Sequence, residues 1–194
     1  MKSDEVYSEY EVKESAIRFD KEETSTNVGC VNSLEETLNV KKITKKCEGV
    51  TRTVAVKGDG TGEIKLTLHM KYNLFVKAYG MDAGGLIDGI KGYGRDSIHK
   101  SFSFVGKVFD ENGTCKLKAY PNLLITNGIS RKIENGAEEI AEIELTANVN
   151  PDENGFGMYE VITDNLKEQN KEQFIENWMT KFSPEMVKKV EVEA

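Results

Sequence analysis

The sequence predicts a mainly β fold, a sandwich or barrel of two antiparallel sheets with a short flanking helix and a C-terminal helix. Residues 64–76 alternate between apolar and polar side chains, which is the period of a half-buried strand. Further strand-like segments lie on both sides of this stretch, and a helical period begins only at Asn165. Because strands and helices are segregated along the chain, an antiparallel sheet is favoured over a parallel one.

The alternating stretch is the longest strand that the sequence predicts. One face would hold Ile64, Leu66, Leu68, Met70, Tyr72, Leu74 and Val76, and the other Lys65, Thr67, His69, Lys71, Asn73 and Lys77, with Phe75 as the apolar exception. This length exceeds the ~5–6 residues of a typical strand. The strand therefore requires a large sheet beside it.

The chain before this strand divides into an arm and two further strands. Residues 1–33 allow one or two strands but contain a long polar, turn-rich segment, so they are expected to form an N-terminal arm. Residues 34–47 and 50–57 are predicted to be strands. The glycine-rich stretch 58–62 would be a hairpin turn before the long strand, because glycine supplies the positive φ angles of tight turns.

A glycine-rich connector follows the long strand. Asp82 is expected to cap a short helix with an apolar face of Leu86, Ile87 and Ile90, because aspartate is a preferred N-cap residue. The glycines of this stretch oppose that helix, since each disfavours a helix interior by up to about 1 kcal/mol.

Two hairpins complete the β region, each built around a turn with the sequence Asp-Glu-Asn-Gly. The first joins residues 102–109 to a strand that Pro121 is expected to end. The second joins residues 141–150 to a last strand at 157–164. In the strand 141–150 the apolar residues fall on one face and the polar face holds Glu142, Glu144, Thr146 and Asn148.

The period changes to that of a helix near the C-terminus. Phe174, Trp178 and Phe182 recur on or near one side of the segment 165–183, as in an amphipathic helix. Ser183 and the proline after it are expected to end this helix before a second short segment. The chain is thus expected to comprise three parts: an N-terminal arm (1–33), a β-sandwich domain (34–164) and a helical extension (165–194).

Composition restricts the classes of function. The chain has 194 residues and a net charge of −7, which disfavours a protein that neutralises nucleic-acid phosphates. No apolar run approaches the ~20 residues of a membrane span, and the N-terminus has no apolar core typical of a secretory signal. The three cysteines are odd in number and unpatterned, which is typical of reduced thiols in a cytoplasmic protein.

Motifs for phosphate or calcium are absent from the sequence. The glycines between residues 80 and 94 match neither a phosphate-binding loop nor a dinucleotide-binding fingerprint. The two Asp-Glu-Asn-Gly segments have Pro121 and Thr163 where a calcium loop needs its last acid. They are therefore predicted to be turns, and no cofactor is expected.

No catalytic constellation can be identified either. His69 and His99 have no cysteine or histidine at ligand spacing, so both are predicted to be solvated rather than bound to metal. No nucleophile elbow or cysteine–histidine pairing is visible. Glu142 and Glu144 are predicted to be part of a solvated acidic face, and we predict that the protein is not an enzyme.

Four segments together carry a likeness to a known family: 46–82, 84–94, 101–122 and 141–162. They resemble the major tail proteins of long-tailed phages and prophages of Gram-positive bacteria. The likeness covers about residues 34–163 and lies in strand order and glycine positions.

The resemblance implies two packed antiparallel sheets with a flanking helix. It also implies rings of six copies that stack into a tail tube, through which DNA passes during ejection without specific binding. Tape-measure and tail-terminator proteins would be partners, no membrane would be involved, and the protein would assemble in the host bacterial cytoplasm and reside in the virion tail.

Two alternatives remain open at this point. The tube of a contractile tail, a tail-like bacteriocin or a secretion system would share this architecture. A ligand-binding β-barrel is an alternative of a different class, against which stands the aromatic fraction of 8% with one tryptophan.

Two surfaces are candidates for function in a stacked ring. Acidic and neutral side chains are expected to line the lumen in preference to Lys65, Lys71 and Lys77, because rings of lysine would hold DNA phosphates. The residues expected in the lumen are Glu142, Glu144, Thr146 and Asn148. The connector is expected to meet a neighbouring ring or subunit through Asp82, Gly84, Gly85, Gly89, Gly92 and Gly94, because glycine adapts to a partner at little steric cost.

Overall fold

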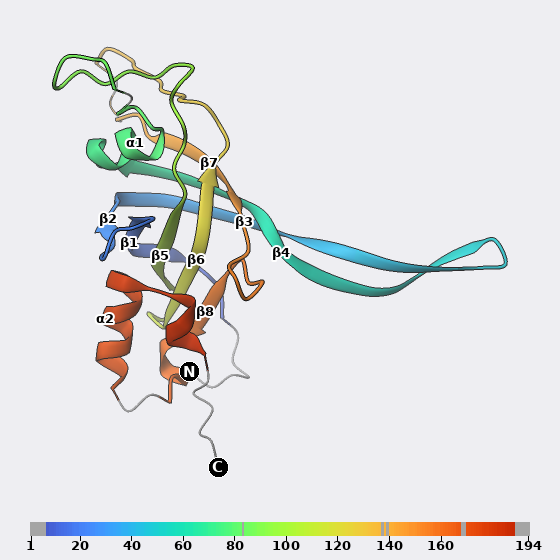
Figure 1. Ribbon diagram of the computed structural model, residues 1–194. Helices are drawn as coiled ribbons and strands as arrows, with labels where there is room; N and C mark the ends of the chain where they lie inside the picture. The colour runs from blue at the N-terminus through green and yellow to red at the C-terminus, as the bar shows by residue number, and fades with distance from the viewer. Residues whose placement is uncertain (1–6, 83, 137, 139, 168–169, 189–194) are drawn as a thin grey trace.

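A computed structural model describes residues 7–82, 84–136, 138, 140–167 and 170–188 (Figure 1). Eight strands form one antiparallel hydrogen-bonded sheet in the order β2-β1-β5-β6-β7-β4-β3, with β8 paired to β6. The strands are β1 (Glu11–Phe19), β2 (Thr26–Asn27), β3 (Gly29–Cys47), β4 (Val50–Met70), β5 (Phe102–Phe109), β6 (Cys115–Ile125), β7 (Ile143–Val149) and β8 (Tyr159–Ile162). The helices are α1 (Tyr72–Ala78) and α2 (Lys171–Lys181), with short 3-10 turns at Thr163–Asn165 and Pro184–Val187. The predicted mainly β fold is confirmed.

The sheet curves around its main hydrophobic core. Buried side chains from β1, β4, β5, β6 and β7 belong to one cluster, which includes Phe19, Leu66, Phe104 and Leu145. Part of the segment expected to be an N-terminal arm thus supplies a strand and core residues to the sheet. Helix α1 adds Leu74, Phe75, Val76 and Ala78 to the same cluster.

A second, smaller core lies between α2 and the outer face of the sheet. Trp178 and Phe182 are each 1% exposed and pack with Val105, Leu117 and Ala119. The Trp178 indole Nε1 also donates to the Lys118 carbonyl oxygen at 3.3 Å. The predicted amphipathic helix is therefore present, but it begins at Lys171, where the Asn170 side chain caps it by accepting from the Gln173 backbone N–H. Residues 189–194 of the predicted last segment lie outside the described residues.

The long central strand ends earlier than its alternation suggested. Strand β4 stops at Met70 and the chain continues as helix α1, so the predicted strand face beyond Met70 is wrong. Leu74, Phe75 and Val76 are all buried, which a strand with one wet face cannot achieve because successive side chains alternate. Phe75, the residue that broke the alternation, is the sequence signal for this helix.

The glycine-rich stretch 58–62 does not form a hairpin turn. It lies inside β4, and the turn is formed by Glu48 and Gly49, with φ of +49° and +81°. Two adjacent residues with positive φ suit the right-handed twist of a two-residue hairpin. The glycines instead lie where the register with β3 shifts between Leu38 and Val40, consistent with glycine in a strand marking a bulge.

Two further boundaries differ from the prediction. Residue 82 and residues 84–90 form turns and bends rather than a helix, and Leu86, Ile87 and Ile90 are exposed. Strand β6 continues through Pro121 to Ile125. Proline is tolerated there because the β5–β6 register is interrupted between Phe102 and Phe104, beside the proline, and a bulge needs no ladder donor at that position.

Candidate assembly surfaces

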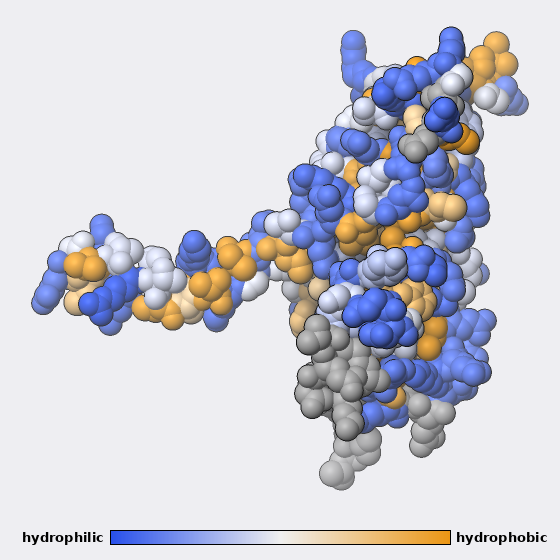
Figure 2. Space-filling model, turned by 180° about the vertical axis from the view of Figure 1, so that it is seen from behind, coloured by the Kyte–Doolittle hydropathy of each residue, from blue (hydrophilic) through white to orange (hydrophobic). Residues whose placement is uncertain are grey.

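The most exposed feature of the molecule is the long end of the β3–β4 hairpin, residues 38–58, which we call the arm. It projects far beyond the curved sheet as an isolated two-stranded ribbon (Figure 1). Hydrophobic side chains alternate with hydrophilic ones along it (Figure 2). Its exposed apolar residues are Leu38, Val40, Ile43, Val50, Val54 and Val56, each 38–58% exposed. A two-stranded ribbon of this kind is at best marginally stable alone in water.

The arm is also strongly basic. The arm carries six lysines and arginines and one acid, which gives it a net charge of +5. Because the whole chain has a net charge of −7, the residues outside the arm have a net charge of −12. Lys41 lies directly opposite Lys57, and Lys45 directly opposite Arg52. Like charges in these positions destabilise a strand pair. The arm therefore has the charge and the apolar surface of a segment that binds an acidic protein surface.

A polar sheet face lies on the convex side of β3, β4 and β7, opposite the main core. Thr146 pairs with Lys65 and Asn148 pairs with Glu63, while Leu145, Ala147 and Val149 are buried behind them. The predicted alternation of β7 is confirmed. Glu144 lies opposite Thr67, and Glu142 follows as a hydrogen-bond acceptor of Asn32.

The three lysines set against these acids occupy different places. Lys65 lies on the polar sheet face itself, because its pairing partner on β7 is Thr146, so its expected separation from the acidic residues is wrong. Lys71 is exposed at the start of α1, and Lys77 forms an ion pair with Glu22. The polar sheet face remains acidic, since Lys65 is accompanied by four carboxylates: Glu35, Glu63, Glu142 and Glu144.

The connector between α1 and β5 lies at one end of the sheet beside the chain segment 126–136 (Figure 1). Asp82 forms an ion pair with Lys91 at 2.5 Å instead of capping a helix. Gly84, Gly85, Gly89 and Gly94 have open space around them, while Gly92 lies near the Leu86 side chain. The expected contact of these glycines with a neighbouring ring stays a prediction.

One connector glycine is required by the fold. Gly80 has a φ of +62°, and a Cβ there would lie 2.1 Å from the Ile98 carbonyl oxygen. The connector therefore returns across the end of α1 at a distance that a side chain would not permit. His99 is fixed in the same place, because its ring nitrogens contact the Tyr93 hydroxyl and the Ile125 carbonyl oxygen. The prediction of a solvated histidine is thus wrong for His99, whereas His69 is exposed.

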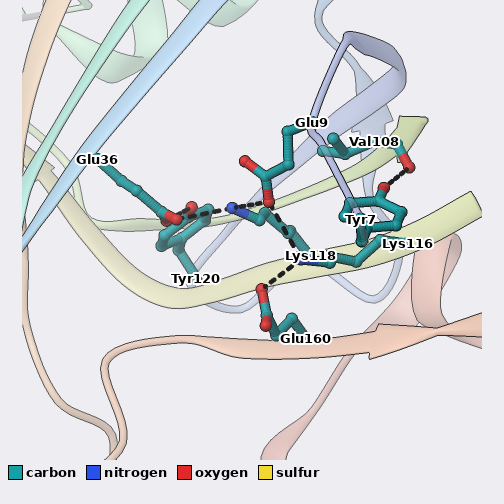
Figure 3. A network of polar contacts seen from close by, with 8 residues as sticks. All are labelled: Tyr7, Glu9, Glu36, Val108, Lys116, Lys118, Tyr120 and Glu160. Carbon is teal, nitrogen blue, oxygen red and sulfur yellow. Dashed lines mark hydrogen bonds and ion pairs between the residues drawn. The ribbon is translucent and has the colours of Figure 1, made fainter. Parts of the chain in front are cut away.

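An ionic network around the buried Lys118 joins β6, β3 and the segment before β1 (Figure 3). The Lys118 side chain on β6 is 1% exposed, and its ammonium lies 2.8 Å from Glu9 and 2.6 Å from Glu36. The Tyr120 hydroxyl donates to the same Glu36 carboxylate. Lys118 thereby ties the segment leading into β1 to strand β3, two parts of the sheet that are not hydrogen-bonded to each other.

The pKa values of this network follow from burial and from the ion pairs. Burial alone would raise the pKa of Glu9, but hydrogen bonds from Lys118 and Lys116 lower it below its usual value. Burial would lower the pKa of Lys118, yet the carboxylates of Glu36 and Glu9 raise it. For Tyr120 burial and the nearby Glu36 act together, and its pKa is strongly raised. At neutral pH the network is therefore an ion-pair tie with a neutral tyrosine.

Neither acidic turn has the arrangement of a metal site. Asp110 accepts from the backbone N–H groups of Asn112 and Thr114, and Asp152 accepts from those of Asn154 and Phe156. These carboxylates thus stabilise their own turns, as predicted. Within the described ranges no group of three or more His, Cys, Asp or Glu side chains could hold a metal ion. The same residues include no helix of sufficient length and hydrophobicity to span a membrane.

Comparisons with known proteins identify structural neighbours only. No protein-family model matches the chain, and no curated protein matches it. A chain of the tube-terminating cap of the anti-feeding prophage is 11% identical, with 82% of this chain and 97% of that chain covered and a TM-score of 0.41.

Two further solved structures are similar to the chain. A chain of the sheath–tube complex of an extracellular contractile injection system is 13% identical, covering 76% of this chain and 88% of that chain at a TM-score of 0.41. A chain of the anti-feeding prophage baseplate is 10% identical, covering 76% and 90% at a TM-score of 0.40. All three TM-scores lie below 0.5, so these likenesses alone do not show the role of this chain.

Proposed function

We propose that this protein is a structural subunit of a tail tube, in which six copies form a ring and rings stack. The observation that carries this proposal is the arm. Among the described residues, its exposed valines and opposed cations have no packing partner on the body of the same copy, because the arm projects away from it (Figure 1). Such a segment is satisfied by contact with neighbouring copies.

The sheet edges support the same function. Strand β3 is the terminal strand of the sheet order, and its outer edge is open over most of its length. An open edge of this length is a template for pairing with another chain. In a ring, the edge of one copy would join the sheet of the next, and a continuous inner barrel would leave no edge exposed.

We propose that the polar sheet face lines the lumen. Four carboxylates and one lysine in each copy would give a wall that repels DNA phosphates, so DNA would pass without specific binding. From the resemblance to major tail proteins we propose that the tube belongs to the virion tail of a long-tailed phage or prophage and is assembled in the bacterial cytoplasm with tape-measure and tail-terminator proteins. The tube of a contractile tail, bacteriocin or secretion system would use the same surfaces.

The core makes a ligand-binding barrel the weaker candidate. The inside of the curved sheet is filled by aromatic and aliphatic side chains, among them Phe102, Phe104 and Tyr120, each at most 2% exposed. A packed interior of this kind does not offer the lined cavity that a ligand-binding barrel requires. By the same reasoning we propose a structural and not an enzymatic role.

Electron microscopy of the concentrated protein tests the proposal. The full chain should form rings or tubes, and a variant with residues 40–57 replaced by a two-residue Asn-Gly turn should remain a folded monomer. The matched control shortens the loop 131–136 instead and should still assemble. A full chain that stays monomeric at high concentration and binds an apolar ligand would support the barrel and exclude the tube.

A further inference from the structure

A groove on the outer face of the sheet has properties that complement the arm. It lies between α2 and the strands β1 and β5, and its volume is about 370 Å³. Ile175 and Met179 on α2 form its apolar floor, and both pack partly on the second core. Glu14, Glu172 and Glu176 line the same groove. The groove is thus apolar at its centre and acidic at its rim.

The rim retains a net negative charge. Lys107 is the cation that lines the groove, and it forms an ion pair with Glu14. Glu172 and Glu176 are exposed on successive turns of α2. Their carboxylates are held about one helical turn apart by their spacing of four residues. Two acids therefore remain available to a cationic partner.

One face of the arm has the reciprocal pattern. Lys42 and Val56 are paired across the two strands and share a face, and Val40 and Lys46 lie on that face by alternation. Val40 and Val56 are 55% and 56% exposed. Among the described residues, neither Lys42 nor Lys46 has an ion-pair partner within 4 Å. This face therefore combines an apolar stripe with two free lysines.

The arm cannot reach the groove of its own copy. Figure 1 shows α2 on one side of the body and the arm projecting from the opposite side. A contact between them must therefore join two copies, and it would be head-to-tail because two different surfaces meet. Contacts of this type generate closed rings or open helical filaments rather than simple dimers.

We infer that the arm of one copy binds in the groove between α2 and the β1–β5 edge of a second copy, an inference that rests on the proposed function. The valines of the arm pack on Ile175 and Met179, and the arm lysines face Glu172 and Glu176. Polyanions such as DNA are a less suitable partner for this face, because a valine stripe contributes nothing to phosphate binding. The residues outside the arm carry a net charge of −12. Since every copy has one arm and one such body, an acidic partner for each arm is present at the same concentration as the arm.

Charge reversal in the full chain tests this contact. The variant Glu172→Lys/Glu176→Lys should raise the concentration needed for assembly at least about tenfold, because two attractive contacts become repulsive. The same change at Glu23→Lys/Glu111→Lys alters net charge equally at exposed sites outside the groove and should leave assembly unchanged. Sedimentation at fixed ionic strength measures the assembled fraction, and circular dichroism confirms that each variant is folded.

A second pair of variants makes the test specific. Lys42→Glu/Lys46→Glu should weaken assembly to a similar extent, and combining it with the groove reversal in one chain should restore assembly. Assembly of the groove variant at wild-type concentration would overturn the inference while leaving the tube intact. If the arm-shortened variant fails to assemble but the groove variant assembles normally, the arm docks on a surface other than the groove, and the inference is wrong. A monomeric wild-type chain would overturn both the inference and the proposed function.

Discussion

Replacing Lys118 with methionine should destabilise the isolated subunit by about 2–3 kcal/mol. Removing one partner of a buried ion pair costs about 3–5 kcal/mol, because the remaining charge is left uncompensated. Here the lysine side chain is 1% exposed, whereas Glu36 and Glu9 are 26% and 42% exposed. The two acids can partly recover hydration, so we expect a loss at or just below the lower end of this range.

Urea unfolding of the monomeric, arm-shortened protein measures this effect. For a chain of this size, 1 kcal/mol corresponds to about 2–4 °C in Tm, so the variant should melt about 5–10 °C lower. The matched control is Lys116→Met on the same strand, whose ammonium lies farther from its partners, 3.2 Å from Glu9 and 3.4 Å from Glu160. Its side chain is 13% exposed, against 1% for Lys118, so it should lose less stability than Lys118→Met.

A double variant separates the ion pair from packing. Lys118→Met combined with Glu36→Gln removes one of the two orphaned carboxylates, so it should recover part of the lost stability. If Lys118→Met alone stays within about 0.5 kcal/mol of the wild type, the network does not tie the segment before β1 to β3 and the reasoning fails. The free energy of unfolding should depend on urea concentration with the same slope in wild type and variant. An equal slope would show that the variants differ in stability and not in the surface they expose on unfolding.

Three further predictions concern pH, the connector and the lumen. The pKa of Glu9 is lowered in the folded state. The stabilisation by its carboxylate is therefore fully present above the unfolded pKa of 4.5 and is lost as the pH falls from there through the folded pKa. Glu9→Gln should show a flatter decline in Tm between pH 5 and 3, and an unchanged decline would contradict this. Gly80→Ala should cost at least about 1 kcal/mol, since a Cβ would meet the Ile98 carbonyl oxygen at positive φ, whereas Gly94→Ala, in open space, should stay within about 0.5 kcal/mol in the same unfolding assay. Glu142→Lys/Glu144→Lys should leave tubes intact but make them retain DNA at low salt, as measured by co-sedimentation; tubes that remain inert to DNA would show that these residues lie outside the lumen.

Alternation along the chain predicted the β fold because each strand buries one face. The faces of β7 and of β4 up to Met70 follow directly from the period of two, as the burial of Ile64, Leu66 and Leu145 shows. The same rule wrongly predicted a strand at Leu74 and Val76. Two turns of helix also place these two side chains against the core, so their burial alone does not distinguish the two elements. Period alone does not separate a short helix from the end of a strand when neither element is long.

The arm could not be recognised from local pattern. Its valines alternate as in a buried strand, yet they are exposed because no element packs on them. The glycines at 58–62 suggested a turn, while the actual turn at Glu48 and Gly49 carries only one glycine. Two pairs of opposed cations, Lys41 with Lys57 and Lys45 with Arg52, were the available signal, but they become visible only once the register of β3 and β4 is known.

The buried network was missed for a related reason. Lys116 and Lys118 alternate with Leu117 and Ala119 in sequence, which predicts a wet face for the lysines. That face is covered by residues from far away in the chain, Glu9 and Glu36. Contacts between segments more than 80 residues apart are set by the curvature of the sheet, and a single sequence does not encode them in any local period.

The position of the polar sheet face in an assembly tests the central proposal most directly. Cryo-electron microscopy of tubes formed by the full chain would measure the rotational symmetry and locate β3, β4 and β7 in the wall. We predict sixfold rings with Glu63, Glu144 and Asn148 facing the lumen. Rings in which these residues lie on the outer wall, or particles without rotational symmetry, would contradict the account.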